Sequence, residues 1–130
     1  MIKTKIVTPD GLYKEVECSI INCCSTDGWR GILPNHMPIV LMLTISRLEL
    51  VIDGNKEQFA IAGGMLYFEN NVATILVDAI ESKDEIDIER ANQAKQRAED
   101  RIKNKEENID LRRAEVALKR AINRINVSSY

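Results

Sequence analysis

The spacing of apolar residues changes once along the chain, close to residue 84. Before that point apolar and polar residues alternate over short segments. After it, apolar residues recur every three or four positions, and neither proline nor glycine occurs. Alternation is typical of half-buried strands, and the longer spacing is typical of amphipathic helices. The pattern therefore predicts a β-structured body over residues 1–84 and a helical arm over residues 85–130.

The body contains several short segments that predict strands. Asp53-Gly54 and Asn70-Asn71 separate consecutive segments, and such residues tolerate the positive φ of tight hairpin turns. Gly63-Gly64 indicates a bend or bulge where two backbones approach closely. Many short strands at regular spacing predict an antiparallel β-sandwich, or flattened barrel. The expected strands are Ile2–Val7, Tyr13–Asn22, Pro38–Leu43, Leu48–Ile52, Gln58–Ile61, Met65–Phe68 and Val72–Val77.

Two neighbouring stretches are expected to be irregular. Residues 27–31, with the sequence Asp-Gly-Trp-Arg-Gly, are predicted to form a loop bracketed by glycines. Pro34 and Pro38 follow shortly afterwards, and two prolines so close together exclude a central strand or a helix there.

The arm carries two apolar stripes with helical spacing, which predict an antiparallel helical hairpin and place the whole chain in the α+β class. Asp84 or Asp87 is expected to cap the first helix, because carboxylates are favoured at a helix N-terminus. Asp110 is expected to cap the second helix, and the polar residues 103–108 to connect the two. The stripes comprise Ile86, Ala91, Ala94, Ala98 and Ile102, then Leu111, Ala114, Leu118, Ala121, Ile122 and Ile125.

Alanine is the commonest residue of the two stripes taken together. Alanine favours helices and allows them to approach closely, but each alanine buries little apolar area. We therefore expect the hairpin to be held weakly against the body, so that it can leave without unfolding it.

The charge balance separates the two parts of the chain. The formal net charge is −2, which is too near zero to indicate a nucleic-acid partner. Residues 1–84 carry 7 basic and 11 acidic side chains, and residues 85–130 carry 11 and 9. The positive arm favours acidic or phosphorylated partners. The longest apolar run, Ile39–Ile45, is too short to cross a bilayer, so any membrane association is expected to go through a partner.

The residues that commonly carry chemistry do not form a catalytic set. Cys18, Cys23 and Cys24 are interpreted as reduced thiols of a cytoplasmic protein's core, since adjacent cysteines in a strand point to opposite faces and do not suit a metal site. His36 is the single histidine and is expected to be structural. Neither a catalytic residue nor a bound metal is expected, and the chain is not interpreted as an enzyme.

Four motifs occur in order along nearly the whole chain. They are Gly28-x-x-Gly31-Ile32-Leu33-Pro34-Asn35-His36-x-Pro38, Ile61-Ala62-Gly63-Gly64, Thr74-Ile75-Leu76-Val77-Asp78 and Asp84-Glu85-Ile86-Asp87. Together they resemble the epsilon subunit of bacterial F-type ATP synthase. Two positions depart from the family: Ile45-Ser46-Arg47 stands where a glycine is usual, and Trp29 is an unusual residue for the glycine loop.

The resemblance implies a rotor component of the central stalk. The sandwich would bind the gamma subunit and the c-ring, with Asp27, Trp29, Arg30 and His36 as contact candidates. The subunit would couple proton flow to ATP synthesis without a catalytic site of its own, as a peripheral component at the cytoplasmic face of the bacterial plasma membrane. The hairpin would extend toward the catalytic beta and alpha subunits and inhibit ATP hydrolysis. Arg112, Arg113 and Lys119 are the candidate contacts of the extended arm.

A narrower resemblance concerns epsilon subunits of bacilli that bind ATP on the compact hairpin. Their pattern is an acidic residue, then Ile-Asp-x-x-Arg-Ala, then two arginines on the second helix. ATP would be a regulatory ligand and not a required cofactor, and the sequence does not specify whether Mg²⁺ accompanies it. The matching residues are Glu81, Ile86, Asp87, Arg90, Ala91, Arg120 and Arg124.

The chemistry of these positions suits a nucleotide. Arg120 and Arg124 are four residues apart and project from one helical face, and guanidinium groups bind phosphate oxygens well. Glu81 and Asp87 would accept hydrogen bonds from ribose or adenine, or hold arginines in place, and Ala91 would leave room for a ring. The chain has no phosphate-binding glycine loop with a lysine, so binding without hydrolysis is expected.

Two plainer interpretations stand beside these. The arginines are also compatible with the solvated face of a helical pair. The whole chain is also compatible with a β-sandwich adaptor whose helical arm binds a partner permanently and takes no ligand.

Overall fold

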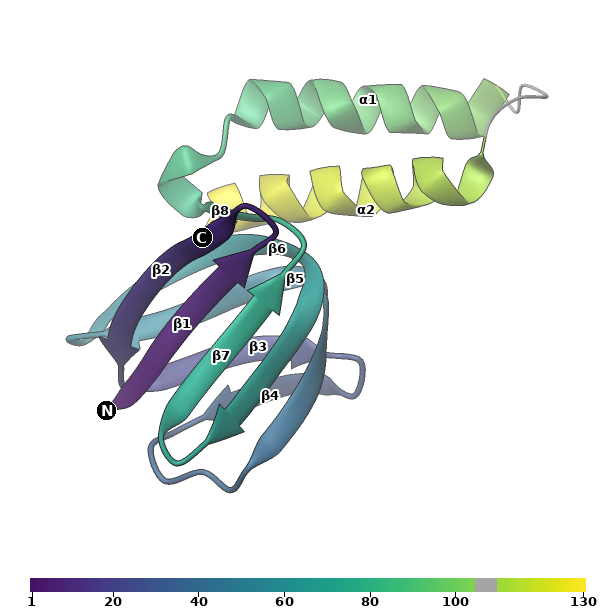
Figure 1. Cartoon of the computed structure of the whole chain (residues 1–130). Helices are drawn as coiled ribbons and strands as arrows, with labels where there is room; N and C mark the ends of the chain where they lie inside the picture. Colours follow the sequence, from purple (N-terminus) through teal and green to yellow (C-terminus); the bar gives the residue numbers. More distant parts are fainter. Residues whose placement is uncertain (105–109) are drawn as a thin grey trace.

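The alternating segments form a single eight-stranded sheet, and a pair of helices lies across one end of it (Figure 1). The computed structural model describes residues 1–104 and 110–130. Its elements are β1 (Ile2–Thr8), β2 (Gly11–Cys18), β3 (Ile20–Ser25), β4 (Gly28–Ile32), β5 (Ile39–Ile52), β6 (Asn55–Glu69), β7 (Val72–Val77), β8 (Ile80–Ser82), the 3-10 helix η1 (Lys83–Glu85), α1 (Ile88–Asn104) and α2 (Leu111–Ser128).

The sheet folds over into a sandwich with the strand order β2-β1-β7-β6-β5-β3-β4, and β8 pairs with β6. All paired strands are antiparallel except β1 and β7, which run parallel from Lys3↔Val72 to Val7↔Leu76. The predicted sandwich is confirmed, with this one parallel pair as an addition. Its core is built from inward side chains of β1 to β7, with Ile2, Leu50 and Phe68 fully buried.

Several predicted strand boundaries are wrong. The predicted pairs of short strands at 38–52 and at 58–68 are the single long strands β5 and β6. The predicted strand Tyr13–Asn22 is divided between β2 and β3, and the predicted loop 27–31 is the strand β4, which pairs with β3. Residues 33–38 contain no strand or helix, as the two prolines require.

The broken pattern in the two long strands has a physical cause. In β5 the buried positions change from Leu41 and Leu43 to Ser46, Leu48 and Leu50, so the inward face shifts by one residue. In β6 the same shift separates Phe59 and Ile61 from Leu66 and Phe68. Each strand continues through the point where the sandwich turns its corner, and there the apolar alternation is lost.

Gly63-Gly64 forms this corner of β6, as the sequence predicts. Before it β6 pairs with β8, and after it with β7. The backbone turns at φ +90° and +149°, and a Cβ atom on Gly64 would lie 2.0 Å from the carbonyl oxygen of Leu76. Only glycine allows strands to approach so closely in this conformation. The hairpin turns are confirmed too, with positive φ at Asp53-Gly54 and Asn70-Asn71.

The arm is an antiparallel helical pair in which α2 lies between the sandwich and α1 (Figure 1). Both predicted caps are present: Asp87 Oδ1 accepts from the Arg90 N–H, and Asp110 Oδ1 accepts from the Arg113 N–H. Asp84 lies in η1, so Asp87 is the cap of α1. Of the predicted connection 103–108, Lys103 and Asn104 belong to α1, and residues 105–108 lie outside the described residues.

Alanine fills the contact between the two helices. Ala91, Ala98, Ala114 and Ala121 are buried, whereas Leu111 and Ile122 of the second stripe are exposed. The apolar contact between the arm and the sandwich is a small separate cluster of Ala60, Ile86 and Val127. The arm therefore contributes nothing to the main core, and its burial is limited to a few side chains.

Candidate functional site

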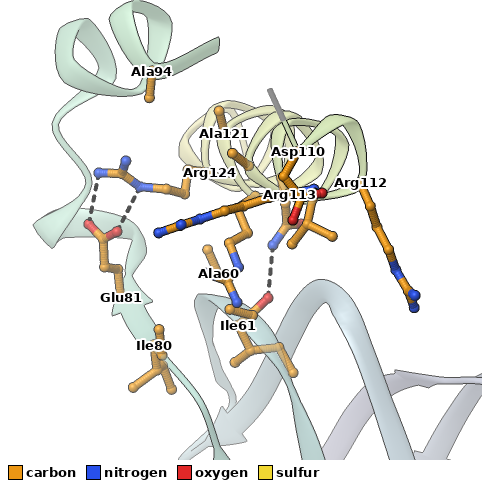
Figure 2. Close-up of a pocket in the computed structure, with 16 residues that line it drawn as sticks. Ala60, Ile61, Ile80, Glu81, Ala94, Asp110, Arg112, Arg113, Ala121 and Arg124 are labelled. Atoms are coloured by element: carbon orange, nitrogen blue, oxygen red, sulfur yellow. Dashed lines mark hydrogen bonds and ion pairs between the residues drawn. The ribbon is translucent and has the colours of Figure 1, made fainter. Parts of the chain in front are cut away.

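A pocket of about 680 Å³ lies between the edge of the sandwich and α2. One wall comes from β6, from Ala79 and from β8. The other comes from α2 and its cap Asp110, and Ala94 of α1 also lines the pocket (Figure 2). The volume is within the range that binds small organic ligands. The lining residues are Ala60, Ile61, Ala62, Ala79, Ile80, Glu81, Ala94, Asp110, Arg112, Arg113, Val116, Ala117, Arg120, Ala121, Asn123 and Arg124.

The two walls differ in chemistry. The sandwich contributes almost only small apolar side chains, such as Ala60, Ile61 and Ile80. The α2 wall contributes four arginines, Arg112, Arg113, Arg120 and Arg124. Two carboxylates, Glu81 and Asp110, accompany them, so the lining charge is positive. The pocket suits a ligand that has an apolar ring and an anionic group.

One of the four arginines is paired across the pocket. Arg124 Nε lies 2.7 Å from Glu81 Oε1, and a terminal nitrogen of the same guanidinium lies 3.3 Å from Glu81 Oε2 (Figure 2). Only the 3.3 Å contact has the geometry of a hydrogen bond. Glu81 thus holds Arg124 in place, which is one of the two roles the sequence suggested. The ion pair also joins β8 to α2.

Asn123 ties α2 to the sandwich at the base of the pocket. Its amide nitrogen donates to the carbonyl oxygens of Ser46, at 2.9 Å, and Ile61, at 3.3 Å. These hydrogen bonds bridge β5 and β6 with one side chain. Asn123 thereby helps to set the distance between α2 and the sandwich.

The chain leaves the sandwich at a second anchored point. The Tyr13 hydroxyl donates to Glu85 Oε1, and the Tyr13 ring packs edge-on against Phe59. Burial and the neighbouring Glu85 carboxylate raise the pKa of Tyr13 to about 12. The hydrogen bond from Tyr13 lowers the pKa of Glu85 below its ordinary value. This contact fixes the segment that leads into α1.

The structure brings together only part of the predicted nucleotide site. Glu81, Arg120 and Arg124 line the pocket. Ile86 packs in the small cluster with Ala60 and Val127, and Asp87 caps α1. Arg90 is exposed and Ala91 is buried, and neither lines the pocket.

Other lining residues were missed by the sequence analysis. Arg112 and Arg113, assigned there to the extended arm, line the same pocket, whereas Lys119 is exposed outside it. Asn123 was not singled out. Helical spacing would have found several of them, because Arg113, Val116, Ala117 and Asn123 lie three to seven residues from Arg120 on the face it shares with Arg124.

The predicted contact residues of the sandwich fall into two groups. Asp27, Trp29 and Arg30 are exposed on the β3–β4 hairpin. His36 is half-buried, with its ring edge-on against Phe68 and Nδ1 2.7 Å from the Met37 carbonyl oxygen. This environment fits the structural role expected for His36.

An apolar surface covers the outer face of β5, β6 and β7. Val40 pairs with Tyr67, and Met65 pairs with both Met42 and Leu76. Of these, Val40, Met42, Tyr67 and Leu76 are between 43% and 57% exposed. Adjacent exposed apolar side chains of this kind mark a surface for a partner. We call this set the outer apolar face.

Two other kinds of site can be examined in the described part of the chain. Within residues 1–104 and 110–130, His, Cys, Asp and Glu side chains form no group of three that could hold a metal ion. Neither α1 nor α2, as described, has the length and hydrophobicity needed to cross a membrane.

Comparison with known proteins places both parts of the chain in one family. The family model of the ATP synthase delta/epsilon chain β-sandwich domain matches residues 1–83, and that of the delta/epsilon chain long α-helix domain matches residues 84–129. The ATP synthase epsilon chain of Ligilactobacillus salivarius is 42% identical, over 100% of this chain and 96% of that one. The epsilon chain of Bacillus cereus strain G9842 is 46% identical, over 95% and 92%.

Solved structures share the fold. A chain of the Euglena gracilis mitochondrial ATP synthase superposes with a TM-score of 0.83 at 24% identity, covering 94% of this chain and 78% of that one. A chain of the Tetrahymena thermophila mitochondrial ATP synthase gives 0.63 at 16% identity, covering 98% and 93%. From the family models and the relatives together, the chain belongs to the ATP synthase delta/epsilon chain family, and within it to the epsilon chains.

Proposed function

We propose that this chain works in the central stalk of an F-type ATP synthase, bound to the gamma subunit and the c-ring. It would couple proton flow to ATP synthesis and carry no catalytic site of its own. The support is the match of both family models and of relatives along more than nine tenths of the sequence. The related solved chains come from assemblies described as F1/c-ring and central stalk/c-ring.

The outer apolar face is the proposed surface for the gamma subunit. Val40, Met42, Tyr67 and Leu76 form it on strands that the core holds rigidly from the other side. A rotor subunit needs a rigid, apolar contact of this kind to transmit torque without slipping. Asp27, Trp29, Arg30 and His36 remain the candidates for further contacts with gamma and the c-ring. Through these partners the chain would lie at the cytoplasmic face of the bacterial plasma membrane.

The pocket between α2 and the sandwich is the proposed site for ATP. The observation that carries this proposal is the row of arginines facing an apolar wall. Arg120 and Arg124 would bind phosphate oxygens, and the wall around Ile61 and Ile80 would accept the adenine. A phosphate group would compete with Glu81 for Arg124. Asp87, Arg90 and Ala91 would contribute from α1 only if its first turn moves toward the pocket.

ATP would regulate the chain by stabilising the compact arm. A ligand that binds only one state stabilises it by about 2.7 kcal/mol at a concentration a hundredfold above Kd. The contacts that hold the arm are individually small and include one apolar cluster, Asn123 and the Glu81–Arg124 pair, so an energy of this size is enough to shift its position. When ATP falls, the helices would extend toward the catalytic beta and alpha subunits, with Arg112, Arg113 and Lys119 facing them, and inhibit hydrolysis.

Titration of the whole chain with ATP and with ADP, each with and without Mg²⁺, tests this site. Calorimetric heat and a raised thermal midpoint are expected for wild type and for Lys119→Ala, because Lys119 lies outside the pocket. Arg120→Ala is expected to lower the affinity at least tenfold, since a charge-assisted contact contributes roughly 1.5–3 kcal/mol.

The opposite result would favour the adaptor without a ligand. The Glu81–Arg124 pair favours that alternative, because it pairs one of the pocket's arginines within the chain itself. An unchanged thermal midpoint at millimolar nucleotide would remove the sensing role and leave the arm as a permanent contact element.

A further inference from the structure

Arg47 of the sandwich contacts two aromatic rings, one from the sandwich at Trp29 and one from the arm at Tyr130. The Arg47 guanidinium carbon lies 4.0 Å from the centre of the Tyr130 ring and 5.3 Å from the centre of the Trp29 ring. These three residues come from β5, from β4 and from the segment after α2. A guanidinium group close to two aromatic rings is attracted by both.

Arg47 is held in position by its neighbours on the sheet. Its guanidinium donates to Glu49 Oε2 at 2.9 Å and to Gln58 Oε1 at 3.0 Å. Glu49 in turn accepts from Gln58 at 2.6 Å and from Asn22 at 2.8 Å, and it is only 7% exposed. These hydrogen bonds fix the plane of the Arg47 guanidinium without help from the arm. Little side-chain entropy is therefore lost at Arg47 when Tyr130 contacts it.

Tyr130 follows the movement of α2. Its backbone N–H donates to the Val127 carbonyl oxygen at 3.1 Å, so it prolongs the last helical turn. Val127 is itself buried in the small cluster against the sandwich. Release of Tyr130 and release of α2 are thus mechanically linked.

We propose that Tyr130, Arg47 and Trp29 form a latch that holds the end of α2 on the sandwich and sets how readily the arm leaves. None of the three lines the nucleotide pocket, so the latch acts on the arm without contacting a ligand there. Its regulatory consequence rests on the proposed function, because a weaker latch lowers the population of the compact state that ATP would bind.

Amide hydrogen exchange of the whole chain, without nucleotide, tests the contact. Tyr130 is 58% exposed, and an exposed cation–π contact changes an equilibrium roughly two- to fivefold. Exchange in the last two turns of α2 is expected to be faster by that factor in Tyr130→Ala. Tyr130→Phe keeps the ring and is expected to exchange at the wild-type rate. Equal rates in Tyr130→Ala and wild type would overturn the latch.

A double-mutant cycle assigns the effect to Arg47. Arg47→Lys keeps the charge beside Glu49 but loses the planar group. In that background Tyr130→Ala is expected to cause less than half of the change it causes in wild type. Full additivity would overturn the assignment, because independent sites add.

Trp29 supplies an internal reporter, since it is the single tryptophan of the chain. Loss of the Tyr130 ring exposes the guanidinium beside the indole to water, so the emission of Trp29 is expected to change in Tyr130→Ala and to stay as in wild type in Tyr130→Phe. These measurements use no nucleotide. A chain that fails to bind ATP can therefore still show the latch, and a chain without the latch can still bind ATP.

Discussion

At the scale of single residues, Gly64 is the glycine with least room for a side chain. A Cβ atom there would lie 2.0 Å from the Leu76 carbonyl oxygen and 2.8 Å from Val77 Cα, both backbone atoms of β7. Backbone strain and overpacking each cost about 1–3 kcal/mol. Gly64→Ala is therefore expected to lower the free energy of unfolding by roughly 3 kcal/mol or more, measured by urea denaturation followed by circular dichroism.

Gly54 is the matched control for this substitution. It also has positive φ, at +80°, but a Cβ atom would meet nothing within 4 Å. Gly54→Ala is expected to cost only about 1 kcal/mol, the usual cost of a left-handed residue. Similar losses for the two variants would mean that conformation alone, and not the close approach of β6 and β7, makes glycine necessary.

Tyr13 and Glu85 give the chain a pH dependence at the start of the arm. The pKa of Tyr13 is raised from 10.0 to about 12, so its contribution to stability is complete below pH 10 and is lost as the pH rises toward 12. The pKa of Glu85 is lowered from 4.5, so its contribution is present above pH 4.5 and is lost as the pH falls below it. The Tyr13–Glu85 hydrogen bond enters both contributions, together with the burial of Tyr13 and the hydrogen bond from Ser82 to Glu85.

Tyr13→Phe is expected to flatten both ends of the stability profile while keeping the ring against Phe59. Urea unfolding at a series of pH values from 3 to 12 measures this, with Tyr67→Phe as control. Tyr67 is hydrogen-bonded to Glu69 on the surface, so its removal is expected to leave the acid decline associated with Glu85 in place. An acid decline equally steep in Tyr13→Phe and wild type would contradict the coupling.

At the scale of elements, the turns and helix caps were predictable from the sequence, whereas the continuity and pairing of distant strands were not. The turns at Asp53-Gly54 and Asn70-Asn71 and the caps Asp87 and Asp110 follow from residues that are neighbours in sequence. The continuity of β5 does not, because the inward face changes between Leu43 and Ser46 and the alternation fails inside one strand. The parallel pairing of β1 with β7 depends on residues about seventy positions apart.

Asp110 offers a direct measure of one predicted element boundary. Its carboxylate accepts the Arg113 N–H, one of the otherwise unpaired amides at the start of α2. Asp110→Ala is expected to destabilise that end of the helix by about 1 kcal/mol, and Asp110→Asn to preserve most of the cap. Amide hydrogen exchange measures this, and Asp110→Ala is expected to exchange faster only in the first turn of α2. An effect of the same size in Asp110→Asn would indicate that the charge matters more than the cap.

At the scale of the whole molecule, the sequence predicted individual residues of the pocket but not how α2 and the sandwich enclose it. Glu81, Arg120 and Arg124 were expected from the resemblance to the family, and helical spacing adds that the two arginines share one face of α2. The apolar wall around Ile61, the bridging amide of Asn123 and the contact of Tyr130 with Arg47 depend on where α2 lies on the sandwich. No local pattern sets that placement, because it combines small contributions from β5, β6 and β8.

The arrangement of buried residues into two separate clusters determines how the molecule comes apart. The sandwich core excludes Val127, which is buried with Ala60 and Ile86 in the smaller cluster. A carboxylate in that cluster would cost several kcal/mol unless it reached water. Val127→Asp is therefore expected to release the arm, with loss of amide protection throughout α2 and unchanged protection in β1 and β7.

The thermal midpoint of the sandwich in Val127→Asp should stay within a few degrees of wild type, because none of its core contacts is removed. Ile122→Asp places the same charge on the same helix at a position that is 37% exposed, and α2 should stay protected there. If Val127→Asp instead lowers the protection of β1, β7 and α2 together, then arm and sandwich unfold as one unit. An arm coupled so tightly could not move between compact and extended positions while the sandwich remains bound to the rotor.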